Sequence, residues 1–90
     1  MSGYIWDLEK ETLNLRKHGI DFATASLAFK DPKRIVIKDS LHSQTEERLF
    51  CIGKVAGKLL TDRFTYREGK IRIIGAGQWR KGKYYYGKKK

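Results

Sequence analysis

The sequence predicts an α+β fold: two N-terminal helices pack on one face of a small antiparallel sheet of about four strands, followed by a short C-terminal helix or irregular tail. Helix signals are confined to the first third of the chain, before the Asp31-Pro32 pair. Short apolar runs with period-two alternation then fill residues 34–76. Hairpin-like turns join the later runs, which makes those strands antiparallel neighbours.

The first element is Tyr4-Ile5-Trp6, a short strand or an extended lead-in. Asp7 is suited to cap a helix that runs to about His18, and Gly19 suits the left-handed residue that follows a helix C-terminus. Leu8, Thr12 and Leu15 fall on one face of this predicted helix, and Leu13 lies beside that face.

Asp21 opens a second helix by accepting hydrogen bonds from its free N–H groups, and Asp31-Pro32 ends it. The buried side of this helix is expected to consist of Phe22, Ala25, Leu27, Ala28 and Phe29. The two helices must cover one face of the sheet, because no other segment can.

Strands are expected at residues 34–38, 48–53, 58–66 and 71–76. The second is apolar on both faces, which favours a central position, and residues 67–70 form a hairpin turn between the last two. Recurrent glycines disfavour a long helix after Ala76. We therefore expect a short, irregular helix within residues 78–86 and a partly flexible tail over residues 84–90.

The composition of the 90 residues, 40% hydrophobic and 33% charged, is typical of a single folded domain. The net charge of +10 is unevenly spread, since no acidic residue follows Glu68. Such a positive field attracts a phosphate backbone or an acidic protein equally. Cys51 lies in an apolar run and is expected to be a buried thiol. No membrane-spanning run or signal peptide is recognisable, which favours a cytoplasmic protein.

Period-two alternation separates the third strand into a basic side and an apolar side. Arg63 lies on the basic side, leading toward Arg67. With Arg72 of the next strand, these side chains could meet over the uncovered face of the sheet, or they could be scattered on a solvated outer face. Asp62 falls on the apolar side, where an unpaired carboxylate is costly. It is therefore expected either to pair with a neighbouring arginine or to lie at a sheet edge.

Two other sites each allow two interpretations. An imidazole titrates near neutral pH, so His18 can transfer a proton, or it can bond the last free carbonyls of its helix. Glu47 can act as a general base, or Glu46 and Glu47 can form ion pairs that position Arg48. Two histidines and one cysteine have no metal-ligand spacing, so no metal site is expected.

The C-terminal stretch alternates aromatic and cationic groups, which is typical of surfaces that bind unpaired bases and phosphates. The residues expected to bind RNA are Arg63, Trp79, Lys81, Lys83, Tyr84, Tyr85 and Tyr86. The same aromatic side chains could instead close the core or contact a partner protein.

Four segments of the chain share one resemblance. They are residues 14–22 at the helix junction, Trp6-Asp7, Glu46-Glu47-Arg48 and Ile71-Arg72-Ile73-Ile74. Together they resemble the BrnT toxin family, whose members are small bacterial ribonucleases with a RelE-like fold, held inactive by an antitoxin called BrnA. The resemblance implies RNA cleavage without a metal or other cofactor, and growth inhibition. It also implies a BrnA-like antitoxin as partner, with operator DNA bound only through the antitoxin complex.

The resemblance also implies roles for individual residues. Arg67, Arg72 and Arg80 would stabilise the charge on the phosphate. His18 or Glu47 would accept the proton of the attacking 2′-hydroxyl. The tyrosine common near the C-terminus of the family would be supplied by Tyr84, Tyr85 or Tyr86.

The chain departs from the family at the end of the last predicted strand. Related chains continue into Ile-Ser-Ala-Arg, whereas residues 74–77 are Ile-Gly-Ala-Gly, so Gly77 stands where an arginine is expected. Two functions therefore stay open: a ribonuclease toxin, or a degenerate module that binds antitoxin or RNA without cleavage. A third is a small basic RNA-binding protein unrelated to toxins.

Overall fold

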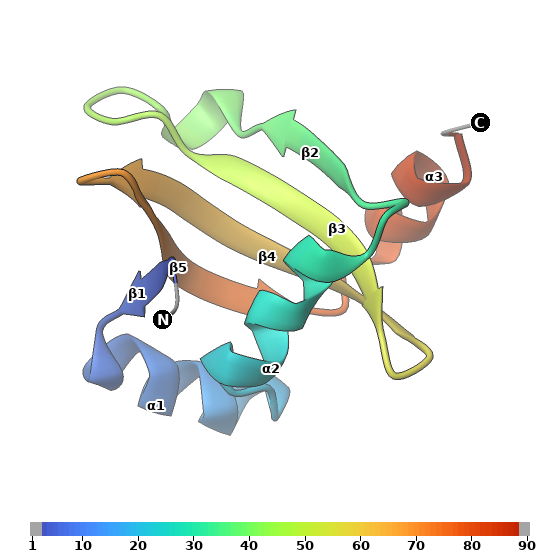
Figure 1. Cartoon of the computed structure of the whole chain (residues 1–90), viewed down its shortest axis with the longest axis horizontal. Coiled ribbons are helices and arrows are strands. Elements are labelled where there is room, and N and C mark those ends of the chain that lie inside the picture. The colour runs from blue at the N-terminus through green and yellow to red at the C-terminus, as the bar shows by residue number, and fades with distance from the viewer. Residues whose placement is uncertain (1–2, 89–90) are drawn as a thin grey trace.

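The computed structural model describes residues 3–88 and contains a five-stranded mixed sheet with helices on both faces (Figure 1). Its strands are β1 (Tyr4–Trp6), β2 (Ile35–Lys38), β3 (Leu49–Val55), β4 (Lys58–Arg67) and β5 (Lys70–Gly77), in the order β1-β5-β4-β3-β2. The helical segments are α1 (Leu8–His18), α2 (Phe22–Ser26) and α3 (Arg80–Lys88), with 3-10 turns η1 (Leu27–Lys30) and η2 (Ser40–His42). The predicted α+β fold, with α1 and α2 on one face, is confirmed.

The sheet has one strand more than the four predicted, because β1 pairs with β5 in parallel. The register places Tyr4 opposite Ile71 and Trp6 opposite Ile73. Three residues are too few for periodicity to distinguish a strand from an extended lead-in, so the tertiary contact decides. The other neighbouring strands are antiparallel, as their turns predicted.

Two tight turns join β3 to β4 and β4 to β5. Ala56 and Gly57 have φ angles of 50° and 82°, and Glu68 and Gly69 have φ angles of 55° and 73°. Positive φ at two successive residues is the geometry of a type I′ turn, whose twist matches that of a hairpin. The predicted hairpin at residues 67–70 is thereby confirmed.

Helix α1 packs through a polar side chain and not through its leucines. Its predicted caps, Asp7 and Gly19, are confirmed. The buried residue is Asn14, whereas Leu8 is 72% exposed and the other leucines of the helix are exposed as well. The apolar face identified from the sequence is therefore not the face that packs, because α1 lies beside the edge of β5, whose backbone needs polar partners.

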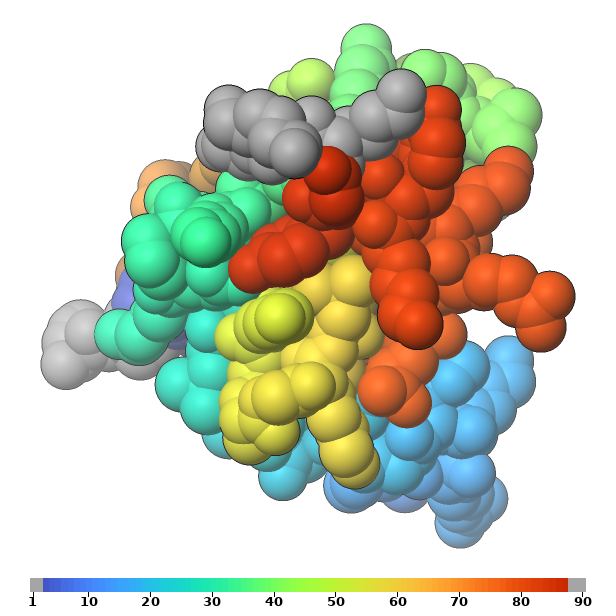
Figure 2. Space-filling view, turned by 90° about the vertical axis from the view of Figure 1, so that its right-hand side faces the viewer, coloured from blue at the N-terminus to red at the C-terminus, as the bar shows by residue number. Residues whose placement is uncertain are grey.

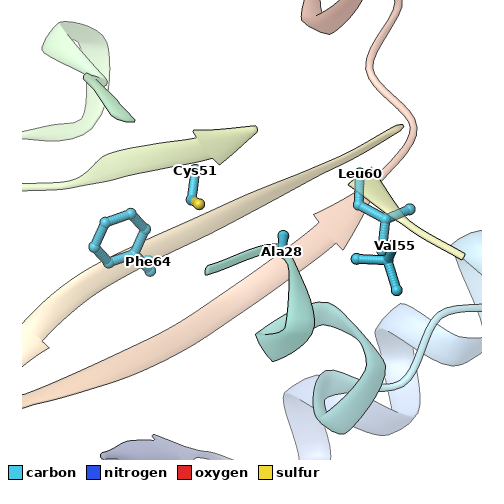
Figure 3. Close-up of a cluster of buried hydrophobic side chains, with 5 residues drawn as sticks. All are labelled: Ala28, Cys51, Val55, Leu60 and Phe64. Carbon is cyan, nitrogen blue, oxygen red and sulfur yellow. The ribbon is translucent and has the colours of Figure 1, made fainter. Parts of the chain in front are cut away.

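Helix α2 and η1 cover the centre of the sheet. A cluster of buried side chains fills the space between η1 and strands β3 and β4 (Figure 3): Ala28, Cys51, Val55, Leu60 and Phe64. A second cluster, next to β5, consists of Phe22, Ala25, Ile73 and Ala76. Leu27 was expected to be buried but is 45% exposed, because the chain tightens into η1 at that residue and turns its side chain outward.

Asp62 is fully buried in β4 and pairs with Cys51 of β3. It lies on the face of the sheet that α2 and η1 cover. Neither carboxyl oxygen has a hydrogen-bond partner within residues 3–88, and β4 is the central strand. Both expected explanations, an arginine partner and a sheet edge, are therefore wrong. Burial raises the pKa of this carboxyl to about 8, so it is neutral at pH 7. Cys51 is buried as predicted, and burial raises the pKa of its thiol to about 12.

Candidate functional site

A cleft of about 700 Å³ separates α1 from the end of the sheet. One wall consists of α1 side chains within residues 10–18, and the other is formed by β3, β4 and the segment that leads into α3. The C-terminal end of β5 forms the floor. Figure 2 shows α1 (blue) and the start of α3 (orange-red) on neighbouring parts of one face of the molecule. Segments from both ends of the chain therefore build this cleft.

The floor depends on an unusual contact at the edge of β5. Strand β1 covers this edge only at residues 71–73. Beyond it, Asn14 takes the place of a strand: its amide accepts from the Ala76 N–H at 3.0 Å and donates to the Ala76 carbonyl at 2.9 Å. Its other N–H donates to the Ile20 carbonyl at 3.0 Å. Asn14 is therefore buried without an unused donor.

His18 follows Asn14 by one helical turn and lies on the same face of α1. Its imidazole packs over Gly77, where a Cβ would lie 3.3 Å from Nδ1. Within residues 3–88 this ring makes no hydrogen bond to a helix carbonyl, and the Leu15 carbonyl accepts from the Gly19 N–H at 2.9 Å instead. The histidine is exposed and lines the cleft.

Positive charge gathers on both walls of the cleft. Lys10, Arg16 and Lys17 lie on α1, and Arg63 extends from β4 on the opposite side. None of the described residues that line the cleft is acidic. The cleft therefore presents a concentrated positive field to an anion, and added salt weakens that attraction.

Three aromatic rings stack beside Arg63. The Trp79 ring lies 5.2 Å from that of Phe50 at an interplanar angle of 28°, and 5.9 Å from that of Tyr85 at 23°. The Arg63 guanidinium lies 5.8 Å from the Phe50 ring centroid, within the range of a cation–π contact. Trp79 remains 36% exposed and lines the cleft, so an aromatic surface faces the cationic wall of α1.

The structure places three of the predicted site residues in the cleft: His18, Arg63 and Trp79. The predicted residues that do not line it are Arg67, Arg72, Arg80, Glu47, Lys81, Lys83, Tyr84, Tyr85 and Tyr86. The phosphate-binding arginines proposed from the resemblance therefore do not converge on this cleft with Arg63.

Arg67 is held at the far end of β4 by an ion pair. Its guanidinium lies 2.9 Å from a carboxylate oxygen of Glu46, and Arg48 lies 3.5 Å from the other oxygen. The hydrogen bond from Arg67 is the main cause that lowers the pKa of Glu46. Of the two predicted acidic partners of Arg48, Glu46 forms the ion pair. Glu47 is exposed.

The remaining arginines lie on the same side of the sheet as Arg63. Arg72 stands opposite Thr65, and alternation along β4 puts Arg63 and Arg67 on that face too. Helix α3 packs on this side of the sheet. Its first residue, Arg80, is exposed. Arg63, Arg67 and Arg72 share one face, as the alternation indicated, but α3 packs on the face that was expected to be uncovered, and of these three arginines only Arg63 lines the cleft.

Helix α3 is fixed to the sheet near both of its ends. Gly82 packs closely on Thr61, where a Cβ would lie 3.0 Å from the hydroxyl oxygen. The Tyr86 hydroxyl donates to the Asp31 carboxylate at 2.6 Å, and the same oxygen accepts from the Lys54 N–H at 2.7 Å. The Lys54 N–H first, and then Tyr86, lower the pKa of Asp31. Tyr86 thus anchors the helix that carries the exposed cations.

Most residues of the cleft were given no site role from the sequence, among them Lys10, Asn14, Lys17 and Phe50. The available signal was Asn14 itself, a residue with low helix propensity in the middle of α1. Such a residue often bonds to a neighbouring backbone, and its spacing of four from His18 puts both on one face. Lys10 and Phe50 gave no local signal, because only the tertiary fold brings them together.

No cluster of three His, Cys, Asp or Glu side chains within residues 3–88 is placed to hold a metal ion. In the same part of the chain, no helix is long and apolar enough to cross a membrane. The sequence matches, over residues 6–82, a family model described as the ribonuclease toxin, BrnT, of a type II toxin-antitoxin system. Among curated proteins none matches. The matched region includes both walls of the cleft.

Proposed function

Because this chain belongs to the BrnT family of ribonuclease toxins of type II toxin–antitoxin systems, we propose that it cleaves RNA in the cleft between α1 and the end of β5, without a metal ion. The single observation that carries the assignment to this cleft is the position of an unbonded histidine between two cationic walls. A proton acceptor and phosphate-binding groups therefore face the same space.

The chemistry requires a base, an acid and cations. His18 accepts the proton of a ribose 2′-hydroxyl, whose oxygen then attacks the adjacent phosphorus. The bond from phosphorus to the 5′-oxygen of the next nucleotide breaks, which leaves a cyclic phosphate, and the departing 5′-oxygen takes a proton from water to become a hydroxyl. Arg63 and Lys17, on opposite walls, stabilise the negative charge that gathers on the phosphate oxygens.

The arginines outside the cleft extend the RNA-binding surface. Arg67 and Arg72 share the sheet face of Arg63, so a strand of RNA that enters the cleft can continue along them. Arg80 would contact the same strand from α3. Substituting Arg67→Ala and Arg72→Ala should suppress cleavage without unfolding the domain; full activity in both variants would remove them from the RNA path.

The expected partner is a BrnA-like antitoxin that covers this basic surface, with operator DNA bound only through the complex. The toxin acts on cytoplasmic RNA. Exposed leucines on α1, next to the cationic wall, supply apolar area for such a partner. An acidic segment of the antitoxin would complement the charge of +10.

A second function, a degenerate module that binds antitoxin or RNA without cleavage, is favoured by one observation. No described acidic residue lines the cleft, so no carboxylate there can share proton transfer with His18. In addition, Gly77 supplies no cation at the floor. If the chain is such a module, it should bind antitoxin or RNA tightly and produce no new RNA ends.

Cleavage of RNA by the purified chain separates the two functions. His18→Ala and Arg63→Ala should each lower the rate by about 100-fold, since a general base and a phosphate-binding cation contribute on that order. His42→Ala and Lys38→Ala, which alter exposed residues outside the cleft, are the matched controls. Wild-type rates in both cleft variants would refute the site. Tight RNA or antitoxin binding by a wild-type chain that produces no new RNA ends would establish the degenerate module.

A further inference from the structure

Asn14 joins three segments of the chain at one point. Its side-chain amide has the donor and acceptor of a peptide group, so it satisfies both backbone groups of Ala76 as a neighbouring strand would. The remaining donor ties the link between α1 and α2 at Ile20. Because Asn14 is only 8% exposed, water does not compete for these bonds. The C-terminal half of α1 is therefore fixed in position and rotation against β5.

This attachment determines where the next turn of α1 lies. His18 follows Asn14 by four residues, a rise of roughly 6 Å along the same helix face. Gly77 follows Ala76 in β5, so the two residues meet. A Cβ at position 77 would lie 3.3 Å from Nδ1 of His18 and 3.5 Å from both Cγ and Cε1. The distance to Nδ1 is tighter than most Cβ contacts and the other two are ordinary contacts, so the imidazole lies directly against the backbone of Gly77.

We propose that Asn14 and Gly77 are positioning residues, which together seat the imidazole of His18 on the floor of the cleft. Asn14 fixes the helix that carries the ring, and Gly77 provides the space into which the ring fits. A side chain at position 77 shifts the imidazole by at least a few tenths of an ångström. The importance of the seat for catalysis rests on the proposed function, in which His18 is the base.

The seating is tested first by NMR, independently of activity. In the wild-type chain, the ring protons of His18 should show Overhauser contacts to the α-protons of Gly77. In Gly77→Ala these contacts and the His18 ring signals should shift. Gly75→Ala is the matched control in the same strand, because its Cβ would lie 3.6 Å from the Asn14 oxygen, an ordinary contact, and does not touch the ring. Absence of the wild-type contacts, or unmoved ring signals in Gly77→Ala, would overturn the proposal.

Cleavage kinetics then test the catalytic consequence. Gly77→Ala should lower kcat about 10-fold with little change in KM, because the cations that bind RNA stay in place. Gly87→Ala, in α3 and away from the cleft, should cleave as the wild type does. A displaced ring with unchanged kcat overturns the positioning role. If the wild-type chain does not cleave RNA at all, the proposed function fails, while the NMR comparison still decides whether these residues hold the ring.

Discussion

The buried carboxyl of Asp62 predicts an unusual dependence of stability on pH. It is fully buried and has no hydrogen-bond partner within residues 3–88. Burial raises its pKa to about 8, whereas an aspartate in an unfolded chain has a pKa of about 3.9. At pH 7 the folded protein therefore carries a neutral acid and the unfolded chain a carboxylate. Asp62→Asn removes this titration and keeps a neutral polar group of the same size.

The sign follows from proton binding. Between these two pKa values the folded state holds a proton that the unfolded state has lost, so the free energy of unfolding falls as pH rises. The slope is about 1.4 kcal/mol per pH unit. From pH 5 to pH 8 the titration of Asp62 should lower the free energy of unfolding of the wild type by roughly 4 kcal/mol, a large part of the 5–15 kcal/mol typical of a domain. Asp62→Asn lacks this loss, so its stability relative to wild type should rise by the same amount.

Urea unfolding, followed by tryptophan fluorescence at pH 5, 6, 7 and 8, measures this difference. The difference between the two proteins isolates Asp62, because every other titrating group is common to both. Glu68→Gln, at an exposed hairpin position, is the control and should show a difference that does not change with pH. A constant difference between Asp62→Asn and wild type from pH 5 to pH 8 would refute the account of a neutral buried acid.

Three further substitutions have defined outcomes. Asn14→Ala should lower the free energy of unfolding by about 3 kcal/mol in urea titrations, since three buried hydrogen bonds are lost, while the exposed Thr12→Ala should change it little. Gly53→Ala should lower Tm by roughly 10 °C in calorimetry, because its Cβ collides with a carbonyl of η1; an unchanged Tm would mean that η1 moves aside freely. Tyr86→Phe should raise the pKa of Asp31 toward the ordinary value, measured by NMR titration, and a pKa that does not move would assign the shift to the backbone N–H groups of Lys54 and Lys33 and the charge of Lys54.

Local signals predicted the elements whose causes are local. Asp7, Asp21 and Gly19 mark helix ends through their own hydrogen bonds and φ angles, and all three act as predicted. The hairpin turns are likewise encoded in adjacent residues. The packing side of α1 was not predictable in this way. Its leucines dominate the periodicity, but Asn14 packs because it meets backbone groups 62 residues away.

The candidate site shows the same division. His18, Arg63 and Trp79 were identified because a titratable, a cationic and an aromatic residue each suggest a role in RNA chemistry without reference to the fold. Arg67 gave the same signal as Arg63, yet its guanidinium is paired with Glu46, 21 residues away. Residue type therefore limits the chemistry, and long-range geometry selects the members of the site.

The contact between Asn14 and Ala76 has a consequence for when the cleft can form during synthesis. The cleft joins residues 10–18 to residues 50–79, and neither part has both cationic walls. Ala76 is synthesised 62 residues after Asn14, so a nascent chain cannot assemble the cleft before residue 76 has been made. The cleft is therefore absent from the early nascent chain, and a partner that contacts both of its walls at once can bind only after the two segments have come together.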